Sequence, residues 1–309
     1  MRVSRISFKT IQKLNKNGKC ESNYSLSKLT TYKVGGLARY FIKICTLESF
    51  IKVILYLESK NYPYYIIGNG SNILASDGGY NGMIIKLGGD FDRILINGTA
   101  MDCGAGVSLA KAYLYARDNN LSGFECGAGI PASIGGATYM NASAYDFEMA
   151  KIVDYVVAYH NGKITYLKNG DCDFGYRYSV FQNDEYIILR IGFKLTKDDQ
   201  VKIMNRHDQA LEKRRLTQPL GYPNAGCVFK KCNGINVSGM LDEMGSKKYT
   251  FGGARVSEKH ANFIINYDHA TAQDIYKLIL ELKEDFYKKY NIELETELKL
   301  IGEFNETNR

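Results

Sequence analysis

The sequence has few of the residues from which metal sites and disulfide frameworks are built. Among 309 residues there are four histidines and seven cysteines, and no two cysteines have the Cys-x-x-Cys spacing. An odd number of scattered cysteines argues against a disulfide framework or a structural zinc site. We therefore expect no metal, and a reducing cytoplasm as the compartment.

Long apolar segments are also missing. The longest runs, such as residues 50–57, are interrupted by a lysine and are too short to cross a bilayer. The first twenty residues are basic but have neither a continuous apolar stretch nor a small-residue cleavage site, which predicts no secretory signal. A hydrophobic fraction of 45% is typical of a globular protein, and 309 residues are enough for two or three domains. We expect no membrane partner.

The formal net charge is +7, and basic residues cluster at positions 213–215, 230–231 and 247–248. Such clusters can bind nucleic acid, but no nucleic-acid-binding motif accompanies them, and most basic runs are simply solvated. A modest positive charge also suits an anionic small molecule. We therefore expect a small anionic substrate and no nucleic-acid partner.

What the chain does have is a dense cluster of glycines. Residues 123–145 read GFECGAGIPASIGGATYMNASAY. Glycine lets the backbone approach a ligand closely, and the small residues between the glycines add little bulk. Because Ile130, Ile134 and Met140 interrupt the run, it predicts an ordered, partly buried loop and helix turn that lines a large, flat or anionic ligand.

A second glycine-rich loop, GNGSN at residues 68–72, follows a predicted strand. Its backbone N–H groups, with the Ser71 and Asn72 side chains, could hold a diphosphate. A third glycine of the dinucleotide fingerprint is missing, because Ile73 stands at that position, and the P-loop lysine is missing as well. Taken alone, the loop is better explained by an ordinary hairpin turn.

Periodicity and capping signals predict a mixed α+β fold. Helices are predicted over residues 47–60, with Thr46 as N-cap, near 108–119, over 198–216 and after Thr271, where Asp274 completes a capping box. Strands are predicted over residues 64–67, 83–87, 153–159, 186–193 and 292–301, the last from its apolar and charged alternation. We divide the chain into an N-terminal extension (1–23), a region of two parts (24–197, with subdomains of about 24–90 and 91–197) and a C-terminal domain (198–309).

Seven segments, in order, resemble the UDP-N-acetylenolpyruvoylglucosamine reductase (UDP-N-acetylmuramate dehydrogenase, MurB) family. They are TYKVGG at 31–36, residues 68–72, residues 127–145, FGYRYSVF at 174–181, NAGCVFK at 224–230, VSEKHANF at 256–263, and residues 294–302. The short spacing from Cys227 to His260 leaves no room for the extra tyrosine-bearing loop of one subgroup. The chain therefore resembles the subgroup without that loop.

The resemblance implies a two-part FAD-binding region of the vanillyl-alcohol-oxidase (PCMH) type and a smaller α/β substrate-binding domain. FAD would be bound without a covalent link. NADPH would reduce it, and the enolpyruvyl ether of UDP-N-acetylglucosamine would then be reduced to UDP-N-acetylmuramate for peptidoglycan synthesis. The residues implied to bind FAD are Gly68, Asn69, Gly70, Ser71, Asn72, Gly127, Gly129, Ser133, Gly135 and Gly136. The oligomeric state stays open and is compatible with a monomer.

The resemblance also assigns three catalytic roles. Arg177 is the candidate stabiliser of the charge that builds on the substrate carboxylate, because a guanidinium suits a planar carboxylate. Glu297 matches the family's active-site glutamate, although the pattern alone leaves Glu295 open. Cys227 stands where the family commonly has the serine that donates the proton. A thiol, with an ordinary pKa of about 8.5, is mostly protonated at neutral pH and can donate.

Each role has a structural alternative: an interdomain salt bridge for Arg177, an exposed acidic strand face for Glu297 and a small buried residue for Cys227. Candidate substrate ligands are Tyr176, Arg214, Arg215, Gln218 and Lys230, and the basic ones could equally be a solvated helix end. Lys231 replaces the family's usual diphosphate-binding asparagine. Two other functions stay open: a different flavoenzyme of the same superfamily, and a nucleotide- or RNA-binding module without catalysis.

Overall fold

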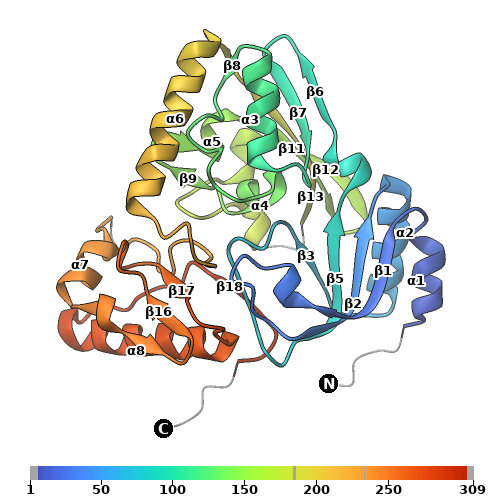
Figure 1. The fold of residues 1–309 in the computed structure, drawn as a ribbon. Helices are drawn as coiled ribbons and strands as arrows, with labels where there is room; N and C mark the ends of the chain where they lie inside the picture. The colour runs from blue at the N-terminus through green and yellow to red at the C-terminus, as the bar shows by residue number, and fades with distance from the viewer. Residues whose placement is uncertain (1–5, 184–185, 233, 305–309) are drawn as a thin grey trace. The chain divides into compact units, whose positions relative to one another are not determined.

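The computed structural model describes residues 6–183, 186–232 and 234–304. The chain divides into two compact units, each assembled from three separate segments (Figure 1). Unit 1 comprises Met1–Glu21, Tyr40–Asn69 and Gly82–Lys213, and unit 2 comprises Ser22–Arg39, Gly70–Asn81 and Arg214–Arg309.

The larger sheet of unit 1 is antiparallel. Its strands are β6 (Ile94–Asn97), β7 (Ala100–Gly104), β11 (Val153–His160), β12 (Lys163–Lys168) and β13 (Ile187–Lys194). Their order is β12-β11-β13-β7-β6. Val156 on β11 pairs with Ile191 on β13, and both side chains are fully buried. This apolar cross-strand pair helps to fix the register at the centre of the sheet.

The second sheet has the order β1-β2-β5-β3, in which β3 and β5 are parallel. Its strands are β1 (Lys19–Ser25), β2 (Leu37–Ile44), β3 (Tyr64–Ile67) and β5 (Tyr80–Leu87). After β2 the chain forms α2 (Leu47–Ser59), which begins at the predicted cap, because the Thr46 hydroxyl accepts from the Ser49 N–H. Its buried face carries Phe50, Val53, Ile54 and Leu57. A short helix, α1 (Phe8–Leu14), contacts α2.

Four further helices lie between residues 109 and 217. They are α3 (Leu109–Asp118), α4 (Ile134–Tyr139), α5 (Met149–Ile152) and α6 (Gln200–Thr217), the last of which continues into unit 2. Ser108 caps α3 and Ser133 caps α4, each by accepting from a backbone N–H three residues on. The cap on α4 begins that helix inside the glycine-rich run.

Unit 2 contains the three-stranded antiparallel sheet β15-β16-β17, with α8 lying along it (Figure 1). Its elements are β15 (Thr250–Phe251), β16 (Ala254–Val256), β17 (Ile264–Asn266), α7 (Val237–Glu243) and α8 (Ala272–Tyr290). The predicted capping box is present, with Thr271 and Asp274 bonded reciprocally. The predicted apolar stripe of α8, from Ile275 to Phe286, is buried. A parallel pair, β4 (Ile73–Ala75) with β18 (Lys299–Ile301), completes this unit.

The remaining elements are short. They are the pairs β8 (Leu121–Ser122) with β14 (Thr196–Lys197) and β9 (Ser143–Ala144) with β10 (Phe147–Glu148), and the 3-10 helices Leu26–Lys28, Gly89–Asp92, Asn169–Cys172, Val180–Gln182 and Ser246–Lys248.

The predicted α+β class is confirmed, but the strand predicted over residues 292–301 is wrong for most of its length. Only Lys299–Ile301 pairs with a neighbouring strand, and Thr296 makes an isolated bridge with Phe229. The predicted domains are continuous, whereas the units interleave along the chain, so the functional domain bounds stay a prediction. The segment predicted as an extension (1–23) contains α1, where Ile11 is fully buried, and part of β1; its residues 1–5 lie outside the described residues.

Candidate functional site

Two predicted cofactor loops meet within unit 1. A Cβ added to Gly68 would lie 2.3 Å from the Ser133 hydroxyl oxygen. That hydroxyl caps α4 by accepting from the Gly136 N–H at 3.2 Å. A Cβ added to Gly135 would lie 2.8 Å from the Cβ of Ala105. Glycine is therefore required by close approach at these positions, and residues 65 apart in sequence are brought together.

The first half of the glycine-rich run packs against residues that lie close to it in the sequence. Gly127 lies against the ring of Phe147, where an added Cβ would be 2.7 Å from the nearest ring carbon. Gly129 lies half-buried in the turn that precedes α4. The run is thus an ordered, partly buried loop and helix turn, as its apolar residues predicted.

The second half of the GNGSN loop belongs to unit 2. Gly70 has φ +65°, and a Cβ there would lie 1.9 Å from the carbonyl oxygen of Leu29. Among the described residues of unit 2, no protein acceptor takes the backbone N–H of Ser71 or Asn72. Successive N–H groups of this kind, beside a glycine that admits close approach, fit the phosphates of FAD.

The Asn72 side chain has a structural contact as well as its predicted cofactor role. Its Nδ2 donates to the Glu297 carbonyl at 3.1 Å, and the Asn72 backbone carbonyl accepts from the Lys299 N–H at 3.0 Å. The loop is thereby fixed to the segment that enters β18. The direct contact of Asn72 with the cofactor stays a prediction.

Arg177 lies in a turn closed by backbone bonds between Gly175 and Tyr178. Its φ is +54°, a left-handed conformation that is uncommon for arginine. The guanidinium donates to the Ser143 hydroxyl at 2.8 Å and, through two nitrogens, to the Ser143 carbonyl at 3.2 Å. It also lies 5.5 Å from the ring centroid of Tyr176. Several contacts therefore hold the side chain in one orientation.

The glycine-rich run itself positions this turn. Asn141, near its end, donates from Nδ2 to the Gly175 carbonyl at 2.8 Å and accepts the Ala150 N–H at 3.0 Å. Ser143 follows on β9, and the next turn holds Tyr145 at φ +55°. The same stretch of chain that forms the predicted FAD loop thus orients Arg177.

In unit 2, Cys227 lies on a segment fixed on both sides. Before it, the Asn224 side-chain oxygen accepts the Gly226 N–H at 3.0 Å. After it, the backbone of Phe229 makes two bonds with the Asn262 side chain, at 2.9 Å to Oδ1 and 2.8 Å from Nδ2. The Cys227 side chain is half-buried.

Sequence reasoning missed the role of Asn262, which is only 6% exposed. The sequence did carry a signal, because this residue lies in the VSEKHANF motif. In the structure its backbone carbonyl also accepts the Val228 N–H at 2.9 Å. Asn262 therefore fixes the two residues that follow Cys227, Val228 through its backbone carbonyl and Phe229 through its side-chain amide.

The structure separates Glu297 from Glu295. Glu297 is half-buried, and its N–H donates to the carbonyl of Val228, next to Cys227, at 2.7 Å. Glu295 is exposed, and its carboxylate forms an ion pair with Lys230 at 2.5 Å. Burial, and then Lys230, lower the pKa of the neighbouring Lys299. Glu297 is thus placed beside Cys227 and the Asn72 loop, whereas Glu295 is engaged with a lysine.

The other predicted substrate ligands lie at the end of α6 and just beyond it. Arg214 is 7% exposed, its carbonyl accepts the Gln218 N–H at 2.9 Å, and Arg215 is exposed. The Arg215 carbonyl accepts from the Lys259 ammonium at 3.1 Å. Their contacts with substrate, like those of Tyr176, Lys230 and Lys231, stay predictions.

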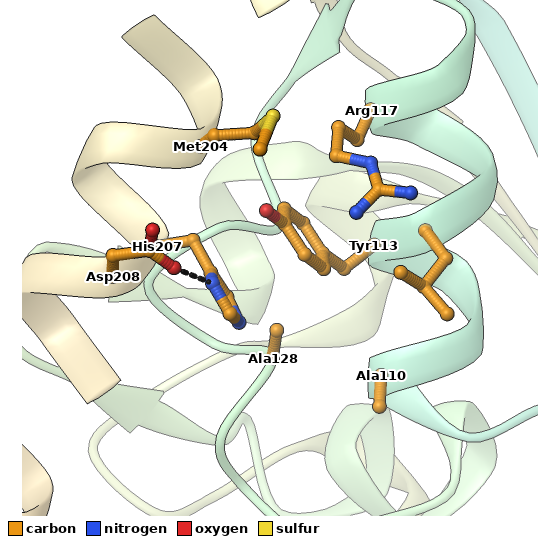
Figure 2. A pocket seen from close by; sticks show the side chains of 8 residues that line it. Ala110, Tyr113, Arg117, Ala128, Met204, His207 and Asp208 are labelled. Atoms are coloured by element: carbon orange, nitrogen blue, oxygen red, sulfur yellow. Dashed lines mark hydrogen bonds and ion pairs between the residues drawn. The ribbon is translucent and has the colours of Figure 1, made fainter. Parts of the chain in front are cut away.

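Unit 1 also has a pocket of about 210 Å³ between α3 and α6 (Figure 2). The rings of Tyr113 and His207 stack there at 4.3 Å, with Arg117, Met204 and Ala128 beside them. None of the predicted site residues lines it. In the part of the chain that the structure describes, no cluster of three or more His, Cys, Asp or Glu residues could hold a metal ion, and no helix could span a membrane.

Comparison with known proteins identifies two family matches. Residues 38–164 match the FAD binding domain, and residues 218–301 match the C-terminal domain of UDP-N-acetylenolpyruvoylglucosamine reductase. These matches confirm the predicted FAD-binding region and the identity of the C-terminal region.

Whole proteins match as well. The reductase of Caldanaerobacter subterraneus subsp. tengcongensis is 36% identical over 95% of this chain and 97% of its own length, and that of Clostridium botulinum is 39% identical over 91% and 92%. The crystal structure of the Thermus caldophilus reductase (MurB) has a TM-score of 0.80 and 31% identity, covering 93% of this chain and 99% of that one. The chain belongs to the UDP-N-acetylenolpyruvoylglucosamine reductase family.

Proposed function

We infer that the chain reduces the enolpyruvyl ether of UDP-N-acetylglucosamine to UDP-N-acetylmuramate, with NADPH as the source of electrons. The observation that carries this inference is similarity along almost the whole chain to proteins named as this reductase, at 36% identity over 95% of its residues. The match of residues 218–301 to the reductase's own C-terminal domain favours it over another flavoenzyme, which would share only the FAD-binding region.

The cofactor is FAD, which supplies the hydride for the reduction when it is bound. The residues that would hold it are those of the two glycine-rich loops, from Gly68 to Asn72 and from Gly127 to Gly136. The close approach of Gly68 to Ser133 supports this assignment, as do the backbone N–H groups of Ser71 and Asn72, which have no protein acceptor among the described residues of unit 2. A purified protein that is colourless and takes up no FAD would refute it.

Arg177 is assigned to the carboxylate of the substrate, where negative charge builds during the reduction. Its contacts with Ser143 are to a hydroxyl and a carbonyl, and they hold the guanidinium in one orientation. A backbone held at φ +54° stores strain, and such strain concentrates at functional sites. Both observations support a role in binding the developing anion.

Cys227 is assigned as the proton donor and Glu297 as a group that assists stabilisation of the intermediate. The hydrogen bonds of Asn224 and Asn262 hold the Cys227 segment in place. The backbone N–H of Glu297 donates to the Val228 carbonyl, which brings Glu297 next to that segment. A positioned general acid contributes about 10²- to 10⁴-fold to a reaction rate. The proton of the thiol passes to the carbon next to the substrate carboxylate, and the sulfur keeps the electron pair.

The assigned substrate ligands are Tyr176, Arg214, Arg215, Gln218 and Lys230, with Lys231 in place of the usual asparagine. A basic cluster at the end of α6 supports contact with the diphosphate of a nucleotide sugar. All seven cysteines are free thiols, which supports the proposal that the enzyme works in a reducing cytoplasm.

Stopped-flow half-reactions test these roles. In Cys227→Ala, we expect NADPH to reduce the flavin at close to the native rate. Reoxidation by the enolpyruvyl nucleotide should fall by about 10²- to 10⁴-fold, because only that stage needs the proton. Cys232→Ala, which changes another half-buried free thiol, should keep both rates. Normal reoxidation in Cys227→Ala would remove this residue from the mechanism, and an enzyme that does not oxidise NADPH in the presence of the nucleotide would refute the function.

A further inference from the structure

The hydroxyl of Tyr32 is a buried polar group without a partner. The residue is fully buried, and its hydroxyl oxygen has no hydrogen bond within the described part of the chain. The main chain beside it is fixed, because the Tyr32 carbonyl accepts from the Asn266 side chain at 3.1 Å. Phenylalanine would fill the same space without an unsatisfied oxygen, so the hydroxyl needs an explanation other than packing.

Tyr32 packs in the same core as the segment that carries Cys227. Its ring belongs to the same apolar core cluster of unit 2 as Ala225, two residues before Cys227, and Val228, the residue after it. Asn266 ties the two segments together, because it donates from its side chain to Tyr32 and from its N–H to the Pro223 carbonyl. Burial, and then the nearby sulfur of Cys227, raise the pKa of Tyr32. The phenol therefore stays protonated at neutral pH and has a proton with which to donate a hydrogen bond.

We propose that Tyr32 is a positioning residue for Cys227, whose buried hydroxyl donates a hydrogen bond to the sulfur as the thiol gives up its proton. The proposal rests on the proton-donor role assigned to Cys227 above. The S–H bond breaks, its proton forms the new C–H bond of the product, and its electron pair stays on sulfur. The phenol keeps its own proton throughout, and water returns a proton to the thiolate before the next turnover. Hydrogen bonds of this kind often form only when the charge develops.

The first test is Tyr32→Phe in the FAD-loaded enzyme. We expect flavin reduction by NADPH at the native rate and reoxidation by the enolpyruvyl nucleotide slowed by about 10-fold, the loss typical of one hydrogen bond to a charged group. Thermal unfolding should be unchanged or shifted upward, because an unsatisfied buried oxygen is removed. Tyr62→Phe, a 3% exposed tyrosine of unit 1, is the control and should keep both rates.

A double-mutant comparison separates this role from a structural one. If Tyr32 acts through the sulfur, Tyr32→Phe should have no further effect on reoxidation in the Cys227→Ala background. Equal slowing in both backgrounds would overturn the proposal, as would native reoxidation in Tyr32→Phe alone.

Alkylation by iodoacetamide gives a readout that does not depend on turnover. Trypsin releases residues 216–230 as a peptide whose single cysteine is Cys227, so mass spectrometry can follow this thiol alone. At a fixed neutral pH, Tyr32→Phe should slow its alkylation, because the thiolate loses a stabilising donor. Unchanged alkylation would refute the hydrogen bond. Normal reoxidation in Cys227→Ala would instead refute the catalytic role of Cys227, and the alkylation rate would still decide the contact.

Discussion

The Cys227 segment should lose its fixed geometry when Asn262 is replaced by alanine. The Asn262 amide accepts the Phe229 N–H at 2.9 Å and donates to the Phe229 carbonyl at 2.8 Å, with all these atoms buried. Alanine leaves both backbone groups without a partner. Each unsatisfied buried group costs about 1–3 kcal/mol, so the free energy of unfolding should fall by roughly 2–6 kcal/mol. That is a large part of the 5–15 kcal/mol typical of a folded protein.

Urea unfolding followed by far-UV circular dichroism measures this loss, with the FAD-loaded protein compared at equal concentration. Because Phe229 follows Cys227 by two residues, reoxidation by substrate should slow more than flavin reduction by NADPH. Asn119→Ala, which removes an exposed amide bonded to the Tyr115 carbonyl, is the control and should change stability by about 0.5 kcal/mol or less. A free energy of unfolding for Asn262→Ala within that same margin would refute the argument.

Two other substitutions test the loops. Gly70→Ala should weaken FAD binding and lower the thermal midpoint, because it adds a clash with the Leu29 carbonyl to the roughly 1–2 kcal/mol of left-handed strain. Gly98→Ala, at a similar φ of +62° in open space, isolates the strain, and equal losses would refute the clash. Burial opposes ionisation of Glu125, but bonds from the Gly123 N–H, Ser122 and Arg206 lower its pKa overall. Its stabilisation is therefore present above the unfolded pKa of about 4.3 and lost as pH falls through the lower folded value. Unfolding midpoints of Glu125→Gln should approach the native ones on acidification, and a constant gap would contradict this.

The local signals of the sequence predicted helices and short strands well. Thr46, Ser108 and Thr271 begin helices as expected, because a hydroxyl that accepts from the first turn is a local property. The strand over residues 64–67 appears with its predicted bounds. The start of each of these helices and the bounds of this strand are set by residues close together in the sequence, so the sequence alone is enough to predict them.

The strand predicted over residues 292–301 failed for a reason that the residues make clear. Leu294 and Leu298 are buried, so the alternation correctly reported one apolar side. Alternation does not report a neighbouring strand, and only the three residues from Lys299 pair with one, at β4. Residues 295–297 make only isolated backbone bonds with residues 228–230. The contact of Gly68 with Ser133 was equally beyond the pattern, because it joins residues distant in sequence. The family resemblance, not periodicity, paired those two loops.

Arg177 shows how the structure adds an argument that the sequence could not supply. Left-handed backbone is signalled in sequence by glycine or asparagine, and arginine gives no such signal. The cost of this conformation, of order 1–3 kcal/mol, persists only where the surroundings over-determine it. Here Ser143 fixes the guanidinium and Asn141 fixes the preceding Gly175, both from the end of the glycine-rich run. Because one stretch of chain forms the predicted FAD loop and orients this cation, the position of the guanidinium relative to that loop is set by the fold of unit 1 itself.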